Sequence, residues 1–271
     1  ALYGRHGEAP AAVLAPRSPA DCFDTALEAA RIAITYRTPV FLLSDGYIAN
    51  GSEPWLVPDV AGLPDLAVQF ATGPNSPDGS TFLPYLRDPQ TLARPWAVPG
   101  TPGLEHRIGG LEKADGTGDI SYDPDNHHRM VLARAARIDS ITVPDLDVDD
   151  PGGAARVLVL GWGSTYGPIG AACRGLRERG LAIAQAHLRH LNPMPANLGA
   201  VLARYDRVIV PELNLGQLAQ VLRSRFLVDV IGYNQVRGLP FAVAELEEAL
   251  ANVVTGDQPD EGLFEAVVTH G

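Results

Sequence analysis

The sequence is poor in lysine and cysteine and has no long apolar run. Lys113 is its one lysine, and its two cysteines, Cys22 and Cys173, lie far apart without a CxxC spacing. Two such thiolates exclude a disulfide framework and an iron–sulfur or zinc site built from this chain's thiolates. No stretch approaches the ~20 consecutive apolar residues of a membrane-spanning helix, and the first residues lack the apolar core of a signal peptide. We therefore expect a cytoplasmic protein that does not enter membranes.

A net positive charge is also missing. The 271 residues include 21 Lys and Arg against 32 Asp and Glu, which gives a formal net charge of −11. An acidic surface repels phosphate backbones, so the composition argues against a nucleic-acid binder and against binding to anionic membranes. Apolar residues make up 46% of the chain, which is enough for a buried core and excludes global disorder.

Charge and proline content divide the chain into three parts, 1–55, 56–150 and 151–271. The middle part holds 7 basic and 15 acidic side chains and 11 of the 23 prolines. It is rich in turn formers and shows little hydrophobic periodicity. We predict a long, extended and mostly irregular connector here, with one short helix over residues 131–137.

The first part predicts an incomplete parallel sheet. Ser18 and Pro19 are typical of the cap and the first residue of a helix, and apolar residues recur at helical spacing over residues 19–35. The apolar run 40–43 predicts a short strand covered on both faces. A helix that leads into such a strand is the second half of a β-α-β unit, whose first strand would end near Val13. We therefore expect this sheet to be incomplete within the chain.

The third part alternates between short apolar runs and helical patterns of about ten residues. Such alternation predicts a complete parallel-sheet α/β domain with right-handed crossovers. The predicted strands cover residues 157–160, 181–186, 207–210 and 227–231, and the predicted helices cover 168–179, 197–205 (capped by Asn197), 215–226 and 244–251.

Glycines at 161, 163 and 167 lie between a predicted strand and a predicted helix, where backbone amides can hold an anion. The third glycine of the dinucleotide fingerprint is replaced by Tyr166. His187 and Arg189 end the following strand, where that fingerprint requires an acid. The segment therefore favours a tight strand–helix turn over a nicotinamide or flavin site.

Four of the seven histidines form two pairs in the sequence. His187 and His190 lie three residues apart across a predicted strand end, which favours a structural or interface role over metal ligation. His127 and His128 adjoin acidic residues of the connector, and we expect them to be solvated.

Two further groups of polar residues are candidates for binding. Asn214 and Gln217 lie where the third strand of the last part meets a helix; Asn214 can cap that helix, but ligands and partners also bind at the carboxyl ends of parallel strands. Arg5, His6 and Glu8 form either a polar loop or, through the arginine and histidine, a site for a carboxylate.

Several long segments, in order, carry a family resemblance. LYGRHGE, SPADCFDTALEAARIA, TPVFLLSDGYIANGSEPW, NPMPANLGAVL and VPELNLGQLAQVLRSRFLVDVIG resemble the α subunit of 2-oxoacid:ferredoxin oxidoreductases, closest to the 2-oxoglutarate type. The likeness covers nearly the whole chain and is weakest over residues 56–125.

The resemblance implies an α/β fold with two domains. Residues 1–55 resemble the C-terminal part of a thiamine-diphosphate pyrimidine-binding domain, and residues 151–271 resemble a transketolase C-terminal-like domain. It also implies a β subunit that holds thiamine diphosphate through Mg²⁺ and carries a [4Fe–4S] cluster. The assembly, with a second αβ unit, converts a 2-oxoacid and coenzyme A to acyl-CoA and CO₂ and passes two electrons to ferredoxin.

The resemblance further implies what the chain lacks. The family's Tyr-Pro-Ile-Thr-Pro segment and the glutamate that protonates the aminopyrimidine precede the position of Ala1, so we expect a C-terminal fragment that is inactive alone, with no catalytic residue and no metal ligand. Arg5 and His6 follow a family loop that lines the substrate pocket, and we expect them near the substrate carboxylates. Asn214 and Gln217 match the family's NLGQL segment, for which an inter-subunit role is expected.

Three other interpretations stay open from the sequence. The first is a pyruvate-specific or branched-chain 2-oxoacid enzyme, because the loops that select the substrate lie mostly elsewhere. The second is a non-catalytic α/β assembly domain, and the third is a generic nucleotide-binding α/β protein.

Overall fold

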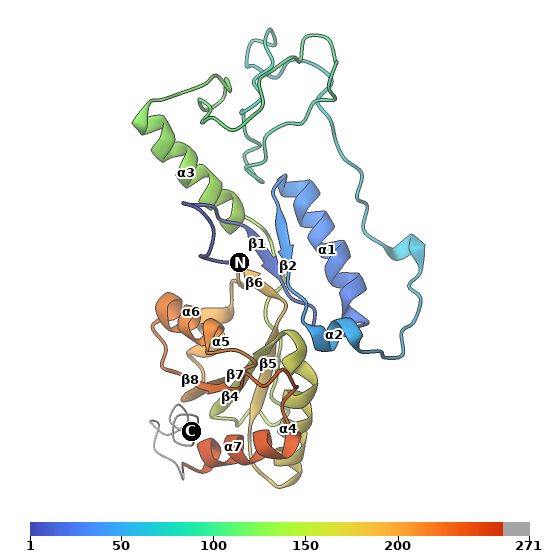
Figure 1. The fold of residues 1–271 in the computed structure, drawn as a ribbon, viewed down its shortest axis with the longest axis vertical. Coiled ribbons are helices and arrows are strands. Elements are labelled where there is room, and N and C mark those ends of the chain that lie inside the picture. The colour runs from blue at the N-terminus through green and yellow to red at the C-terminus, as the bar shows by residue number, and fades with distance from the viewer. Residues whose placement is uncertain (257–271) are drawn as a thin grey trace. The chain divides into compact units, whose positions relative to one another are not determined.

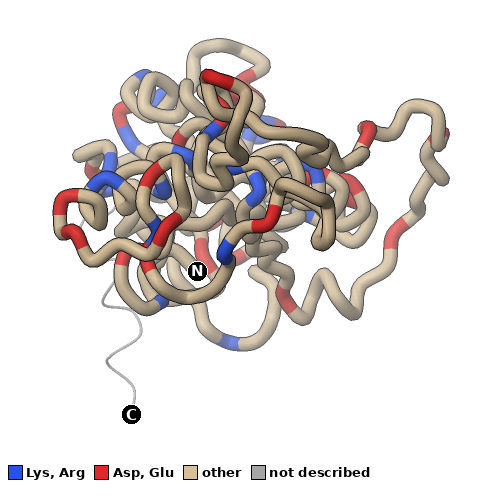
Figure 2. The backbone as a smooth tube through the Cα atoms, turned by 90° about the horizontal axis from the view of Figure 1, so that it is seen from above, with Lys and Arg blue, Asp and Glu red and all other residues tan. Residues whose placement is uncertain are grey.

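The computed structural model describes residues 1–256 and divides them into two compact units (Figure 1). The first unit comprises residues 1–13, 26–41 and 57–142. The second comprises residues 14–25 and 42–56 together with the chain from residue 143 onward. No helix within residues 1–256 has the length and apolarity that crossing a bilayer requires. Figure 2 shows Asp and Glu interspersed with Lys and Arg along the backbone.

Helix α1 (Asp21–Tyr36) begins in the second unit and ends in the first. Asp21 and Asp24 lie in its first turn, where the helix dipole favours negative charge. The helix predicted over residues 19–35 is confirmed, with bounds that differ by two residues or fewer. Strand β1 (Ala12–Leu14) is fully buried and contains Val13, near which the first strand was predicted to end. The neighbouring strand β2 (Val40–Leu42) is only partly buried.

The prediction that β2 is covered on both faces is wrong. Phe41 and Leu42 are 38% and 37% exposed. β2 lies at the end of the sheet order, next to β1, and the described chain leaves these side chains partly uncovered. The guanidinium of Arg5 covers part of this surface, 4.9 Å from the centre of the Phe41 ring.

The segment 57–123 of the first unit is mostly irregular, as predicted, with the 3-10 turn η1 (Val60–Gly62) as its one short helix. The helix expected at 131–137 is present but longer, as α3 (Pro124–Asp139). Its cap explains the difference: the carboxylate of Asp123 accepts hydrogen bonds from the backbone N–H groups of Asp125 and Asn126. Pro124 occupies the position after the cap, where its missing N–H costs nothing.

The second unit is built around a five-stranded sheet with the order β3-β5-β4-β7-β8. Four of the strands are parallel and confirm the predicted topology, whereas β3 runs antiparallel to β5 at the edge. The strands are β3 (Val148–Asp149), β4 (Val157–Trp162), β5 (Ala184–Leu188), β7 (Arg207–Glu212) and β8 (Val230–Asn234).

Helices alternate with these strands. They are α4 (Tyr166–Glu178), α5 (Leu198–Leu202), α6 (Gln217–Phe226) and α7 (Val243–Thr255); the remaining short elements of the unit are α2 (Gly46–Asn50), the 3-10 turn η2 (Gly163–Thr165) and β6 (His190–Asn192). One core cluster joins β4 and β7 to α4 and α7 through residues such as Val159, Ile209, Leu176 and Leu246. Burial of these apolar side chains fixes the sheet and thereby the strand ends at which the polar residues lie.

The predicted cap at Asn197 is wrong. Its side chain makes no capping hydrogen bond to α5. Instead, its Oδ1 accepts a hydrogen bond from the Leu146 N–H at 2.8 Å and its Nδ2 donates to the Leu146 carbonyl at 3.0 Å. Asn197 therefore anchors the segment that precedes β3, because an amide side chain can satisfy one backbone donor and one acceptor at once.

Candidate functional site

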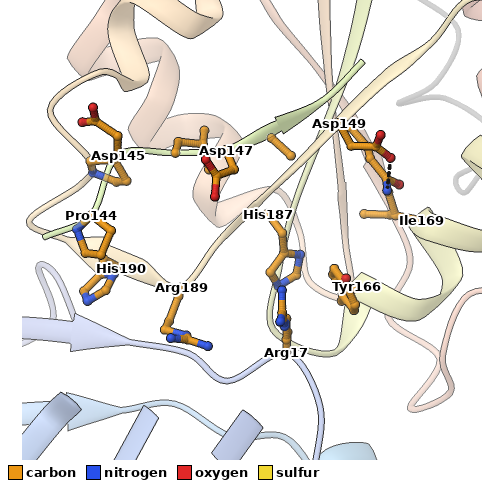
Figure 3. Close-up of a pocket in the computed structure, with 14 residues that line it drawn as sticks. Arg17, Pro144, Asp145, Asp147, Asp149, Tyr166, Ile169, His187, Arg189 and His190 are labelled. Carbon is orange, nitrogen blue, oxygen red and sulfur yellow. Dashed lines mark hydrogen bonds between the residues drawn. The ribbon is translucent and has the colours of Figure 1, made fainter. Parts of the chain in front are cut away.

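A cavity of about 330 Å³ lies along β5 in the second unit (Figure 3). It follows the strand to its carboxyl end, the edge of a parallel sheet at which ligands bind. The walls combine polar and apolar side chains and carry charges of both signs. The lining residues are Arg17, Pro144, Asp145, Leu146, Asp147, Asp149, Tyr166, Ile169, Gln185, Ala186, His187, Arg189, His190 and Pro195.

His187 is the most perturbed group of this cavity. Its Nε2 atom is inaccessible to solvent and has no hydrogen-bond partner within residues 1–256. Burial lowers the pKa of His187 to about 3, and the positive charges of Arg17 and Arg189 add to that effect. The imidazole is therefore neutral at neutral pH. Its ring meets the edge of the Tyr166 ring at 5.1 Å between centroids.

Two cations of the cavity share one buried carboxylate. Asp21 at the start of α1 forms ion pairs with Arg189 and, at 3.9 Å, with Arg17. The same carboxylate accepts hydrogen bonds from the Arg17 N–H and from the Thr25 hydroxyl. One acid thus holds two arginines in place. The Arg17 guanidinium also lies 4.7 Å from the centre of the Tyr166 ring, a cation–π contact.

The acidic residues of the cavity come from the segment that leads into β3. In Figure 3, Asp145 and Asp147 lie on the side opposite Arg17 and Arg189. Asp149 is already paired, because it accepts hydrogen bonds from Arg177 at 2.8 Å and from Gln185 at 2.9 Å. Within residues 1–256, no three His, Cys, Asp or Glu side chains gather in a way that could hold a metal ion. The cavity thus has Arg17 and Arg189 on one side and Asp145 and Asp147 on the other.

The turn at Gly161–Gly167 is closed by the hydroxyl of Thr165. Thr165 Oγ1 accepts a hydrogen bond from the Trp162 N–H at 3.2 Å and donates to the Trp162 carbonyl at 2.8 Å. A Cβ atom at Gly161 would lie 2.6 Å from Ile169 and 3.1 Å from His187, so glycine permits the close packing of β4 on α4. This geometry supports the tight strand–helix turn that the sequence favours.

The loop after β7 is organised by a fully buried acid, Glu212. Its Oε1 accepts hydrogen bonds from Trp162 Nε1 at 3.1 Å, Asn214 Nδ2 at 3.1 Å and the Leu218 N–H at 2.9 Å, and its Oε2 accepts from the Ala219 N–H at 3.0 Å. Glu212 thus accepts hydrogen bonds from N–H groups in the first turn of α6 and neutralises the positive end of that helix. The sequence places Glu212 at the strand end but does not reveal this role.

The side chain of Asn214 is used within the same loop. Its Oδ1 accepts hydrogen bonds from the N–H groups of Gly216 at 2.8 Å and Gln217 at 2.9 Å. The cap position of α6 is nevertheless Gly216, so Asn214 closes the turn that precedes the helix and is not its cap residue. The Gln217 side chain is exposed, and beside it Leu215 is 76% exposed. The structure brings Asn214 and Gln217 together at the start of α6, but neither lines the cavity along β5.

Arg5 and His6 lie in the N-terminal loop of the first unit. Arg5 Nε donates a hydrogen bond to the Ala9 carbonyl at 3.1 Å, and its terminal nitrogens donate to the carbonyls of Ala1 and Ala9. Arg5 therefore holds its own loop in shape, while His6 is exposed. Neither residue lines the cavity along β5.

The other histidines are explained by local contacts. His127 Nδ1 lies 2.7 Å from Glu112 Oε2, and both His127 and His128 are exposed, as expected for solvated side chains. His190 is buried beside the cavity.

Sequence reasoning missed most of the cavity. Arg17, Asp145, Asp147 and Tyr166 come from three separate segments, and no local pattern links them. The one available signal was the position of His187 and Arg189 at the end of a parallel strand.

The sequence of this chain is similar to those of a known class of protein. The family described as pyruvate flavodoxin/ferredoxin oxidoreductase, thiamine diphosphate-binding, matches residues 2–121. The chain belongs to the family of 2-oxoacid:ferredoxin oxidoreductase α subunits.

Particular relatives narrow the class. The chain is 62% identical to the 2-oxoglutarate oxidoreductase subunit KorA of Mycobacterium tuberculosis over 94% of its own length and 38% of that protein. It is 32% identical to subunit alpha of 2-oxoacid:ferredoxin oxidoreductase 1 of Aeropyrum pernix, over 93% of this chain and 40% of that protein. The chain therefore spans well under half the length of these two relatives.

A solved structure shares the fold over nearly the whole chain. The 2-oxoglutarate:ferredoxin oxidoreductase from Magnetococcus marinus, with 2-oxoglutarate, coenzyme A and succinyl-CoA bound, matches with a TM-score of 0.83 and 29% identity. The match covers 94% of this chain and 44% of that one. It confirms the α/β fold with a parallel sheet that the sequence predicts.

Proposed function

We propose that this chain works as part of the α subunit of a 2-oxoglutarate:ferredoxin oxidoreductase. The enzyme would convert 2-oxoglutarate, coenzyme A and oxidised ferredoxin to succinyl-CoA, CO₂ and reduced ferredoxin. The observation that carries this proposal is the 62% identity over 94% of the chain to a subunit named for 2-oxoglutarate. The Magnetococcus marinus neighbour with 2-oxoglutarate and both forms of coenzyme A bound supports the same substrate.

The redox cofactor does not fit this chain. A [4Fe–4S] cluster is held by four thiolates, whereas the sequence has two cysteines, of which Cys173 is buried and Cys22 partly buried. We therefore assign the cluster to the partner β subunit, and ferredoxin would accept electrons there.

Thiamine diphosphate is assigned in the same way. When bound, it supplies the carbon nucleophile and electron sink that decarboxylation of a 2-oxoacid requires. Its diphosphate is held through Mg²⁺, which one or two carboxylates bind together with the phosphates, and the family's organisation implies that the β subunit supplies that site. We assign the Mg²⁺-diphosphate to the β subunit and derive no catalytic step for the residues of this chain.

The remaining assignments follow the family's organisation. Residues 1–55 would form the C-terminal part of the pyrimidine-binding domain, and residues 151–271 would form the transketolase C-terminal-like domain. Residues 56–150 would connect the two domains. Residues 257–271 of the second domain lie outside the described residues. A second αβ unit would complete the assembly, in the cytoplasm. At the start of α6, the exposed Gln217 would contact a neighbouring subunit while Asn214 shapes the loop that presents it.

A reconstituted complex tests the substrate. The complete α subunit that contains this chain, co-expressed with its β subunit, is expected to yield a brown complex that reduces ferredoxin with 2-oxoglutarate and coenzyme A. Pyruvate and 2-oxoisovalerate serve as the competing substrates. If the complex prefers pyruvate or 2-oxoisovalerate, 2-oxoglutarate is not its substrate and the proposed substrate is wrong. A colourless chain that recruits no cluster-bearing partner would favour the non-catalytic assembly domain instead.

Arg5 and His6 are proposed to contact the carboxylates of the substrate. Replacing Arg5 by alanine in that complex is expected to raise the KM for 2-oxoglutarate about tenfold or more, because a charge-assisted hydrogen bond contributes roughly 1.5–3 kcal/mol. His6→Ala is expected to give a smaller increase, since its side chain is exposed.

A second measurement separates this role from the local one. Arg5 also holds the loop through the carbonyls of Ala1 and Ala9. Arg5→Lys keeps the charge, so partial rescue of KM indicates a substrate contact. An unchanged KM in Arg5→Ala, or an equal rise in the exposed control Arg107→Ala, would argue against the assignment.

A further inference from the structure

A second cavity, of about 400 Å³, lies within the first unit and gathers basic side chains from three segments of the irregular chain and α3. Five basic residues and one acid, Glu112, contribute to its walls. In a chain whose overall charge is −11, such a local excess of positive charge needs an explanation. The basic residues are Arg87, Arg94, Lys113, Arg134 and Arg137.

The single acid of the cavity is already committed. Glu112 Oε1 accepts a hydrogen bond from Arg134 at 3.2 Å, and Glu112 Oε2 lies 2.7 Å from the ring of His127. Asp88 lies near the cavity, but its carboxylate accepts hydrogen bonds from the N–H groups of Gln90 and Thr91 in its own turn. Neither carboxylate is left to neutralise the other cations.

Lys113 and Arg94 are held without a carboxylate partner among the residues that the structure describes. Lys113 is only 3% exposed. Its ammonium group donates hydrogen bonds to the carbonyls of Gly109 at 3.1 Å and Leu111 at 2.5 Å. The Arg94 guanidinium lies 5.1 Å from the centre of the Tyr85 ring. Carbonyl and aromatic contacts fix the position of these cations but leave their charge intact.

Arg87 and Arg137 have buried donors with nothing to donate to. The Nε atoms of both are inaccessible to solvent and lack a hydrogen-bond partner within residues 1–256. Arg87 Nη1 reaches the Leu92 carbonyl at 3.0 Å. The Arg137 guanidinium forms no ion pair with the described part of the chain. Burial, and then the charges of Arg87, Arg134 and Arg94, lower the pKa of Arg137 to about 10, so the group stays charged at neutral pH.

Unpaired donors and like charges in a partly buried site oppose folding. Burial lowers the pKa of Arg87, and the charge of Asp115 offsets only part of that effect. The Asp115 carboxylate pairs with none of these arginines in the described chain. The arrangement is stabilised when a multiply charged anion enters, because planar guanidinium groups bind phosphate oxygens through paired hydrogen bonds.

We propose that this cavity binds a small phosphate-bearing anion, with a diphosphate group as the minimal element, held by Arg87, Arg94, Arg134, Arg137 and Lys113. A single phosphate meets fewer of the five cations than a diphosphate does. The diphosphate can belong to a free inorganic ion or to a nucleotide, and the two sources differ in whether an attached nucleoside adds affinity.

Calorimetric titration and thermal unfolding of the 271-residue chain test the proposal. Inorganic diphosphate is expected to bind saturably and to raise Tm, by mass action on the folded state, more than sodium chloride of the same ionic strength. Inorganic phosphate is expected to bind at least tenfold more weakly. ADP and coenzyme A are titrated in parallel; tighter binding of either than of diphosphate assigns a nucleotide source.

Variants separate binding from packing. In Arg87→Gln/Arg137→Gln, diphosphate affinity is expected to fall about tenfold or more, while Tm without the anion stays equal or rises because repulsion is relieved. Arg129→Gln is the matched control, an exposed arginine of the same helix outside the cavity. Binding no stronger than the salt effect, or an equal loss in Arg129→Gln, would overturn the proposal. If the double variant fails to fold, Arg137→Gln alone gives the same comparison.

Discussion

Replacing Glu212 by alanine is expected to lower the free energy of unfolding by about 3–5 kcal/mol, because it leaves buried donors without an acceptor. The carboxylate is fully buried and accepts hydrogen bonds from Trp162, Asn214, Leu218 and Ala219. Without it, two amides at the start of α6 and the indole N–H of Trp162 lose their acceptor. The same substitution opens a cavity between β7 and α6.

Urea unfolding of the variant and of the unchanged chain measures this effect. Glu248→Ala is the matched control, since Glu248 is an exposed acid of α7, and a change within ±0.5 kcal/mol is expected there. Glu212→Gln keeps the size of the side chain but places an NH₂ group against N–H donors, so it is expected to destabilise as well. A cost below 1 kcal/mol for Glu212→Ala would show that water replaces the carboxylate.

The fold of the second unit could be predicted because its apolar runs alternate cleanly. Each of the four parallel strands was expected from a run of β-branched and aliphatic residues, and its bounds were off by three residues or fewer. Strand β3 was missed because Val148–Asp149 is two residues long and stands in an acidic segment. Its pairing depends on the neighbouring β5, which no local pattern reveals.

The binding features were harder to predict for the same physical reason. The sequence indicates a local role for Asn214 beside α6, because its hydrogen bonds reach only two and three residues along the chain. Glu212 bonds with Trp162, fifty residues away, and Arg189 pairs with Asp21 across 168 residues. The sequence shows such residues as polar, but only the folded sheet shows which of them meet. Arg87 and Arg137 were missed for this reason.

His187 is expected to make the protein less stable in mild acid. Its pKa is about 3 in the folded chain, mainly through burial, against an ordinary 6.5. The unfolded state therefore binds a proton more readily, so stability is fully present above pH 6.5 and falls as the pH decreases towards 3. Linkage gives a loss of about 1.5 kcal/mol between pH 6.5 and pH 5, a range above the titration of ordinary carboxylates.

Urea unfolding at pH 7, 6.5, 5.5 and 5 measures the slope in the unchanged chain and in His187→Gln. The glutamine variant cannot take up the proton, so its unfolding free energy is expected to be about 1.5 kcal/mol less sensitive to pH over this range. His128→Gln, an exposed histidine, is the control and should keep the slope of the unchanged chain. If His187→Gln does not fold, the imidazole signals of the unchanged chain give the answer by NMR. A titration midpoint of His187 near 6.5 would mean that the ring is hydrated and that solvent reaches Nε2 from the cavity along β5.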